Sequence, residues 1–531
     1  MRREPDLRSV VRLLLGLVAL LATPAPAQES PSSSNPGTSR YLPLGHWAYP
    51  YIHLLRDRGP LKGLQPLVQP YRRVDVASAV RRAMTASNAS RPERGWLAEL
   101  EREFAPELAV LKAGAGADAS QVSGGFSIGQ TAVTSRHRDP LRSAGDPAAF
   151  VFSEADLAAT FPSLVAALRF RWDEWLLNDP QFPDGIVVEQ HPNFLGFLDF
   201  GARAEDAYFE LQLPYFRLFA GRLSRNWGLP GTLGLLVSDY SYSYDQVAYR
   251  LGSDRLGING FVAQLDEWPD NTKRWLSEHR LDWQLSDRLT FSAAEAVTFG
   301  GVNRSFDFRM ANPLSVWVVG GFGISWLEGP NANNNFTELS LRWSPGSWLV
   351  SYLGLMIDEM PGGGTPLAHG LQLGLRFPRL GPTTALRLDY SQLGAVTYRS
   401  IRPYERFAFR DIGIGRDLAD HDLLSATLDW MPGSRLMVSP TVHLLRRGEG
   451  DFRDPWPADA DANGPVLFVG QVETTLRAAV RGQWRSGPRA LVEWDLGENL
   501  RWNADHTPGL HRAQFVARAR LGLTFRSWGR L

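Results

Sequence analysis

The chain has 531 residues, and its 56 basic and 56 acidic side chains give a formal net charge of zero. A nucleic-acid-binding protein gathers positive charge, so this balance gives no reason to expect a nucleic-acid partner. The chain contains no cysteine, which excludes disulfides, thiol catalysis and lipid attachment through a cysteine. Aromatic residues make up 11% of the chain, which suits a protein with aromatic belts at two membrane surfaces.

The N-terminus carries an export pattern. Four arginines precede the apolar run 13–22, and Ala25-Pro26-Ala27 follows as a small-x-small cleavage site. Because the apolar run is too short to span a bilayer, the pattern predicts a secretory signal peptide over residues 1–27. Residues 28–40 then read as a flexible tail. No later apolar stretch is long enough for a transmembrane helix, so membrane insertion would require a barrel.

Residues 41–112 differ from the rest because their apolar residues recur at helical spacing. Gly59 is placed to end the first helix, and Asp75 is placed to cap the start of the second. We expect a small helical domain over 41–112, located in the periplasm, and a linker over 113–120. The three predicted apolar faces are Trp47, Tyr51, Ile52 and Leu55; Val76, Ala79, Val80, Ala83 and Met84; and Trp96, Leu97, Leu100, Phe104 and Leu108.

From residue 121 onward, apolar residues alternate with polar ones. The clearest case is 513–525, where every odd position is Ala, Phe or Leu and the even positions are mostly polar or small. Period two with one apolar face indicates a strand between two different media, and about 9–11 residues suffice for a tilted strand to cross a membrane. The same alternation recurs along the chain. It predicts an all-β, antiparallel transmembrane barrel over residues 121–531.

Turn signals give a strand count. Eight short turns define sixteen strands, and a first strand near 122–134 and a last near 512–525 bring the total to about eighteen. We expect the short turns in the periplasm and the longer connections outside. The short turns are expected at 162–163, near 214, and at 252–254, 286–287, 344–347, 378–382, 431–434 and 486–488. The longer connections are expected at about 135–147, 174–198, 225–240, 268–275, 300–334, 358–367, 394–421, 446–465 and 496–511.

Two groups of aromatic residues follow from this topology. One group lies beside the short turns and predicts a periplasmic girdle: Phe161, Trp343, Trp348, Phe377, Trp430 and Trp484. The other group lies in the expected outer loops, where aromatic faces could stack on sugars with polar side chains nearby. These candidate glycan-binding residues are Trp175, Trp227, Trp268, Trp275, Trp317, Trp326, Tyr404 and Trp456. The alternative interpretation of the second group is an upper aromatic girdle with solvated loops.

Metal and catalytic motifs are weak. Asp459, Asp461 and Asn463 match the start of a calcium loop, but Gly470 stands where that loop needs an acidic ligand, so we expect a polar loop there. Asp420-His421-Asp422 could supply a base but has no serine motif to activate. We therefore expect neither an enzyme nor a cofactor.

Three stretches resemble the Wzi-type capsule-assembly outer-membrane lectins: Asn312-Pro313-Leu314, 353–359 and 398–430. The last contains the aromatic-rich segment, Ile-Gly step and acidic residue typical of that family. The resemblance implies a periplasmic helical domain before an eighteen-stranded barrel. It also implies lectin-like binding of exported polysaccharide that helps to attach capsule or exopolysaccharide to the cell surface.

A second resemblance covers about forty residues. His46-Trp47-Ala48, followed by Tyr51-Ile52 and by spaced Gly and Pro residues, is similar to a single S-layer-homology motif, although Arg73-Val74-Asp75 replaces the usual Thr-Arg-Glu-like step. That motif implies tethering to peptidoglycan-linked polymer, and the alternative is a helical plug. The alternative function is accordingly a tethered diffusion porin. Either function implies a monomer in the outer membrane, with outer-membrane lipid and the barrel-assembly machinery as partners.

Overall fold

The structure is a computed structural model that describes residues 37–86, 89–113, 120–142, 145–173, 201–314, 333–359, 366–457 and 466–530. The expected signal peptide over 1–27 and most of the expected linker over 113–120 lie outside these residues.

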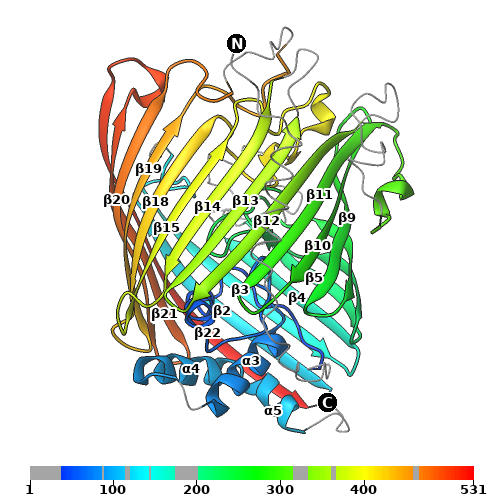
Figure 1. Ribbon diagram of the computed structural model, residues 1–531, viewed down its shortest axis with the longest axis vertical. Helices are drawn as coiled ribbons and strands as arrows, with labels where there is room; N and C mark the ends of the chain where they lie inside the picture. The colour runs from blue at the N-terminus through cyan, green and yellow to red at the C-terminus, as the bar shows by residue number, and fades with distance from the viewer. Residues whose placement is uncertain are drawn as a thin grey trace.

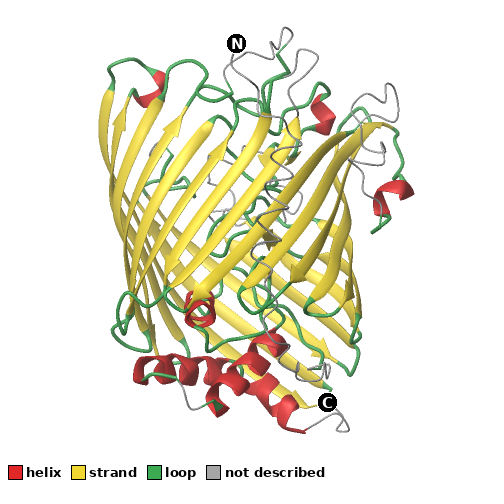
Figure 2. Cartoon of the chain, viewed as in Figure 1, coloured by secondary structure: helices red, strands yellow, loops and turns green. Residues whose placement is uncertain are grey.

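Eighteen antiparallel strands form a closed barrel, as the turn count predicts, and β2 pairs with β22 to complete the ring (Figures 1 and 2). The short turns all lie at one end, which we call the turn end, and the longer connections lie at the other, the loop end. The wall strands are β2 (Gln121–Val133), β3 (Ala148–Thr160), β4 (Leu164–Asp173), β5 (Gly201–Gln212), β6 (Phe216–Arg222), β8 (Asp245–Gly252), β9 (Leu256–Glu267), β10 (Thr272–Gln284), β11 (Leu289–Val302), β12 (Asn334–Gly346), β13 (Leu349–Glu359), β14 (Ala368–Phe377), β15 (Thr384–Leu393), β18 (His421–Trp430), β19 (Leu436–Arg447), β20 (Glu473–Ser486), β21 (Ala490–Trp502) and β22 (His511–Arg530).

The two faces of the wall differ as the alternation predicts. On β22, Leu521 is 50% exposed and Phe525 is 47% exposed on the outer surface. Arg520, between them, lines a cavity inside the barrel and pairs in register with Glu493 of β21. Outward leucine beside inward arginine is the arrangement of a wall with lipid outside and a polar lumen inside.

All eight predicted short turns are present, but two predicted loops are too long. The loop expected over 268–275 ends early because β10 begins at Thr272, and the one expected over 496–511 begins late because β21 continues to Trp502. In both places the strand extends past its apolar stretch because the backbone ladder continues, with Thr272 opposite Val302 and Trp502 opposite His511. The polarity of these strand ends explains why the sequence pattern assigned them to loops.

Four helices precede the barrel and lie across its turn end (Figure 1). Within the described ranges, none of the helices combines the length and the apolar character needed to cross a membrane. Gly59 ends the first helix with a positive φ of 102°, as predicted. We call residues 37–113 the helical segment, and its helices are α2 (Tyr49–Arg58), α3 (Arg73–Thr85), α4 (Arg91–Glu103) and α5 (Ala105–Ala113).

Two details of this segment correct the sequence predictions. The third predicted helix is divided into α4 and α5 at Phe104, whose buried ring lies under the Arg73 guanidinium. Asp75 does not cap α3, because Arg72 occupies the cap position and its guanidinium binds the Asp75 carboxylate at 2.6 Å instead. A strong ion pair thus takes the carboxylate away from the backbone N–H groups it was expected to bind.

The helical segment packs directly on the barrel. Its apolar core also includes Ala385, Met431 and Met437, which belong to the turn end of the wall. The Arg58 guanidinium donates hydrogen bonds to four carbonyl oxygens around the β14–β15 turn, at 2.7–3.1 Å. The segment is therefore docked by both apolar burial and a polar clamp.

His46 makes this docking sensitive to acid. Burial lowers the pKa of His46 from 6.5 to about 4, although its ring nitrogen lies 3.3 Å from a Glu103 oxygen. Burial opposes ionisation of Glu103 as well, yet His46, Arg526 and Arg73 together hold the pKa of Glu103 well below its usual value. Between pH 6.5 and 4 the unfolded segment therefore binds a proton on His46 that the docked segment does not.

We expect the free energy of unfolding of the helical segment to fall as the pH drops from about 7 to 4.5, by about 2–3 kcal/mol. The chain has no cysteine, so Met84→Cys, at an exposed position of α3, offers a single labelling site for a fluorophore. The measurement is the urea concentration at the midpoint of unfolding of the segment, followed by the fluorescence of this label at a series of pH values. His46→Gln should flatten the dependence; an equally steep decline in His46→Gln would contradict this role for His46.

The lumen is crossed by three chain segments that bind one another. In the helical segment, β1 (Val68–Gln69) pairs with β7 (Asn226–Trp227), which belongs to the connection 223–244. That connection in turn binds the connection 394–420, since the Ser238 hydroxyl donates to the Gly415 carbonyl at 2.6 Å. Wall side chains such as Phe336 and Phe261 complete a buried apolar cluster with these segments. Long loops thus fold inward, and the barrel has a core of its own.

Candidate functional site

At the loop end, Arg274 of β10 joins two of the predicted aromatic residues. Its guanidinium binds an Asp266 oxygen at 2.6 Å and lies 5.7 Å from the centre of the Trp268 ring. The same guanidinium donates to the backbone carbonyl of Tyr404 at 2.8 Å. Trp268 and Tyr404 are far apart in sequence, and the structure brings them to one edge of the barrel. We call Asp266, Trp268, Arg274 and Tyr404 the aromatic corner.

The aromatic corner is rigid and partly open. The Trp268 indole N–H donates to the second Asp266 oxygen at 2.9 Å, which fixes the plane of the ring. Trp268 and Tyr404 are half-buried, so each residue is partly open to solvent. A fixed aromatic face beside a carboxylate can stack on an apolar surface of a ligand while the carboxylate accepts hydrogen bonds.

Two other predicted aromatic residues do not stand on exposed outer loops, and these placements are corrected. Trp227 is only 2% exposed because it packs in the lumen, with its ring centre 5.5 Å from that of Phe261. Trp275 lies within β10, where Phe306 of the connection after β11 covers its ring at 5.4 Å. The local sequence does not indicate either placement, because each depends on contacts with residues of another segment.

Of the remaining residues predicted to bind a glycan or a metal ion, the structure describes Trp456 but not the others. Trp456 is half-buried at the loop end, and the neighbouring Pro455 carbonyl accepts a hydrogen bond from Arg399. No described contact joins Trp456 to the aromatic corner. Six predicted residues lie outside the described ranges: Trp175, Trp317 and Trp326 of the aromatic set, and Asp459, Asp461 and Asn463 of the calcium-loop motif.

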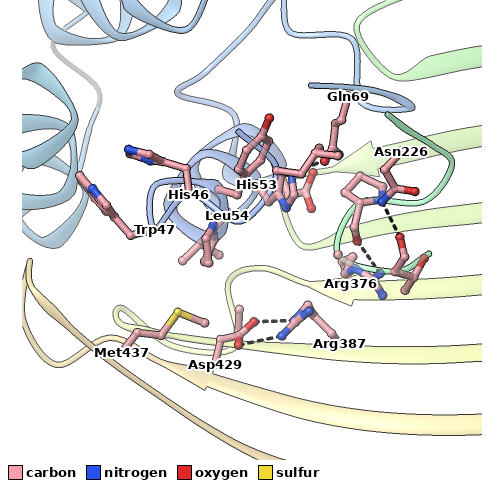
Figure 3. A pocket seen from close by; sticks show the side chains of 18 of the residues that line it. His46, Trp47, His53, Leu54, Gln69, Asn226, Arg376, Arg387, Asp429 and Met437 are labelled. Atoms are coloured by element: carbon pink, nitrogen blue, oxygen red, sulfur yellow. Dashed lines mark hydrogen bonds and ion pairs between the residues drawn. The ribbon is translucent and has the colours of Figure 1, made fainter. Parts of the chain in front are cut away.

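Inside the barrel, cavities remain between the three crossing segments and the wall. One of about 450 Å³ lies between α2 and strands β14, β15, β18 and β19, and Figure 3 shows His46, His53, Arg376 and Arg387 around it. The Arg387 guanidinium makes a two-pronged contact with the Asp429 carboxylate, at 2.6 and 3.1 Å (Figure 3). This cavity is therefore enclosed by the helical segment on one side and by polar wall residues on the other.

Two further cavities adjoin the first, because Arg387 lines all three. One, of about 360 Å³, extends toward the loop end, where Arg142 binds Asp417 at 2.7 Å. The other, of about 420 Å³, lies against β19–β22. Sequence alternation indicated that wall arginines face inward. The alternation does not indicate that residues of the connections 135–142 and 223–244 line the same cavities as these wall arginines.

The closed ring of eighteen antiparallel strands, with apolar residues outside and polar residues inside, defines the class of the protein. It has an outer-membrane β-barrel fold preceded by a small helical segment. No protein-family model and no curated protein sequence matches the chain.

Solved structures give the particular likenesses. The chain is similar to Wzi of Escherichia coli, described as an outer-membrane protein involved in group 1 capsule assembly and a carbohydrate-binding β-barrel. That match has a TM-score of 0.60 at 12% identity and covers 92% of this chain and 99% of Wzi. This chain is less similar to OccAB4 of Acinetobacter baumannii. That match has a TM-score of 0.43 at 9% identity and covers 77% of this chain and 98% of OccAB4. A BenF-like porin from Pseudomonas fluorescens also gives 0.43, at 8% identity over 77% and 98%. The first match supports the predicted barrel with preceding helices.

Proposed function

We propose that the protein binds exported polysaccharide at its loop end and helps to attach or assemble capsule or exopolysaccharide at the cell surface. The observation that carries the proposal is the filled lumen: β1, β7 and the connection 394–420 form a packed core where a diffusion porin needs an open path. The Wzi likeness supports the same function, since that protein is described as carbohydrate-binding.

In this proposal the barrel lies in the outer membrane, with the loop end outside and the helical segment in the periplasm. Short turns on the periplasmic side and long connections outside are the usual polarity of such barrels. Lipid contacts the outward apolar faces, and the barrel-assembly machinery inserts the chain. The protein acts as a monomer. Tethering through the S-layer-homology-like stretch is the less favoured role of the helical segment, because Tyr51 and Ile52 of that stretch are completely buried and cannot contact a polymer.

The binding mode in this proposal is weak and repeated. Each aromatic face at the loop end contributes a shallow stacking contact, and a long polymer engages several proteins or several sites at once. The aromatic corner is the first such contact, because Asp266 and Arg274 hold Trp268 and Tyr404 in place.

We expect Trp268→Ala to weaken polymer binding about two- to tenfold, since a lost aromatic contact costs about 0.5–1.5 kcal/mol. The measurement is affinity electrophoresis of the purified protein in gels that contain the exopolysaccharide of the producing cells. The matched control is Trp348→Ala, which removes a 60% exposed tryptophan at the turn end and should leave binding unchanged. If the polysaccharide slows the migration of Trp268→Ala and of the unmodified protein equally, Trp268 does not take part in binding.

Conductance separates this function from the porin alternative. In planar bilayers the purified protein should show little steady ionic current because β1, β7 and the connection 394–420 cross its lumen. Large, steady current together with no retention of polysaccharide by cells would favour the diffusion porin.

A further inference from the structure

The connection after β11 folds back over the outer face of the barrel wall. Figure 1 shows its short helix η2 (Phe308–Ala311), drawn in green at the right, outside the barrel beside β9. The Ser277 hydroxyl of β10 donates a hydrogen bond to the Met310 carbonyl, which fixes this helix against the wall. We call residues 303–314 the outer flap.

The wall under the outer flap belongs to its lipid side. On β10, Ser277 shares its face with Trp283, which is exposed on the outer surface, whereas Leu276 packs in the buried cluster of the lumen. Ser277 stands in register with Val262 of β9, and Val262 stands in register with the exposed Val247 of β8. The outer flap therefore covers the wall beside a row of side chains that face lipid.

Aromatic rings connect this wall to the exposed surface of the outer flap. Phe306 packs edge-on against Trp275 of β10, with 5.4 Å between ring centres, and lies 5.9 Å from Phe299 of β11. Phe308 packs against Phe306 in turn, at 5.5 Å, and is 84% exposed. Met310 is buried in the cluster with Phe299. The short helix η2 thus holds Met310 against the wall and presents Phe308 outward.

Charged groups of the outer flap bind partners within the protein. The Arg309 guanidinium makes a two-pronged contact with the Asp307 carboxylate, at 3.0 and 2.5 Å. The Arg304 guanidinium donates to the Gly300 carbonyl at 3.0 Å. Leu314, at the end of the flap, is 76% exposed. Exposed apolar side chains beside charges that already have partners suit contact with hydrocarbon.

We propose that the outer flap dips into the outer leaflet of the membrane and contacts lipid acyl chains through Phe308 and Leu314. The supporting observations are the continuity of the flap with the lipid-facing wall and its exposed apolar side chains. The flap lies against the loop-end half of β10, and aromatic side chains are enriched at the border between headgroups and acyl chains. This contact fixes how deeply one side of the barrel sits in the membrane. The inference rests on the membrane location of the barrel and not on polysaccharide binding.

The experiment uses the full-length protein with a single fluorophore, since the chain has no cysteine of its own. Phe308→Cys carries the label, in phosphatidylcholine vesicles that contain a lipid with a nitroxide quencher near the headgroup end of one acyl chain. Two control sites carry the same label. Leu521→Cys lies on the lipid face of β22, and Ile401→Cys replaces a 69% exposed apolar residue of the connection 394–420.

The lipid nitroxide should quench the label at Phe308→Cys at least half as strongly as the label at Leu521→Cys. The label at Ile401→Cys should instead be quenched by aqueous iodide and not by the lipid. Heat-resistant migration on gels confirms that each variant is folded. If Phe308→Cys does not assemble, Leu314→Cys takes its place in the same measurement.

Quenching of the Phe308→Cys label by iodide and not by the lipid would overturn the proposal, because the outer flap would then lie in water. Quenching by neither would overturn it as well, since Phe308 would then face protein. If the label at Leu521→Cys also escapes the lipid nitroxide, the lipid-facing wall itself is refuted. That result differs from a failure of the outer flap alone, in which the Leu521→Cys label is quenched and the Phe308→Cys label is not.

Discussion

Leu521→Arg is expected to abolish most assembly of the folded barrel. Leu521 is 50% exposed on the outer face of β22, the strand that closes the ring by pairing with β2. It lies near the middle of its strand, where an arginine facing lipid costs about 2–4 kcal/mol. The measurement is the fraction of heat-resistant, fast-migrating protein in membranes after expression.

The matched control is Arg520→Leu, one residue earlier on the same strand. Arg520 faces the lumen, where its guanidinium lies 4.1 Å from the centre of the Phe152 ring, so leucine keeps an apolar contact and exposes no charge to lipid. We expect this variant to assemble nearly as well as the unmodified protein. Equal yields from the two variants would mean that the inner and outer faces of β22 are assigned wrongly.

The barrel wall could be predicted because its determinants are local. A period of two along each strand fixes which side chains face lipid, and turn residues such as Pro162 and Gly252 mark where each strand ends. Those signals sufficed for the closed ring of eighteen strands. They failed where a polar strand end resembles a loop, as at Thr272 and Trp502.

The interior could not be predicted, because it depends on contacts between residues far apart in sequence. The Tyr398 hydroxyl donates to the Leu235 carbonyl, and the Trp227 backbone pairs with Val68. No sequence pattern distinguishes an outer loop that folds into the lumen from one that stays in solvent. For that reason the sequence places Trp227 in an outer loop, although it is buried in the lumen, and does not predict that Trp268 and Tyr404 meet at Arg274.

The helical segment shows the same division. Helical spacing predicted its helices, but the sequence did not indicate which surface of the barrel would receive them. Arg58 illustrates why: it is 3% exposed, and its partners are carbonyl oxygens of a turn more than 300 residues away in the chain. A lone arginine at the end of an amphipathic helix would ordinarily be assigned to solvent.

Arg58→Ala is expected to release the helical segment from a barrel that stays folded. The substitution removes the donor to four carbonyl oxygens, including those of Pro378 and Pro382. It also removes a cation 3.7 Å from the buried Glu93 carboxylate, leaving Arg379, at 3.1 Å, as its remaining ion-pair partner in the described structure. Orphaned buried polar groups of this kind together cost about 3 kcal/mol or more. Burial already lowers the pKa of Arg58, so the clamp holds its charge against a desolvation cost.

The measurement is limited trypsin digestion in detergent, read as the rate of cleavage within residues 41–112 while the barrel keeps its heat-resistant migration. Arg82→Ala is the matched control, because Arg82 is an exposed arginine of α3 whose guanidinium donates to the Ser78 hydroxyl and the Lys62 carbonyl of the same segment. Cleavage should be at least tenfold faster in Arg58→Ala and unchanged in Arg82→Ala, apart from the trypsin site that each substitution removes. If Arg58→Ala resists trypsin as the unmodified protein does, apolar packing against Ala385, Met431 and Met437 alone holds the segment. The polar clamp would then contribute to the geometry of docking and not to its strength.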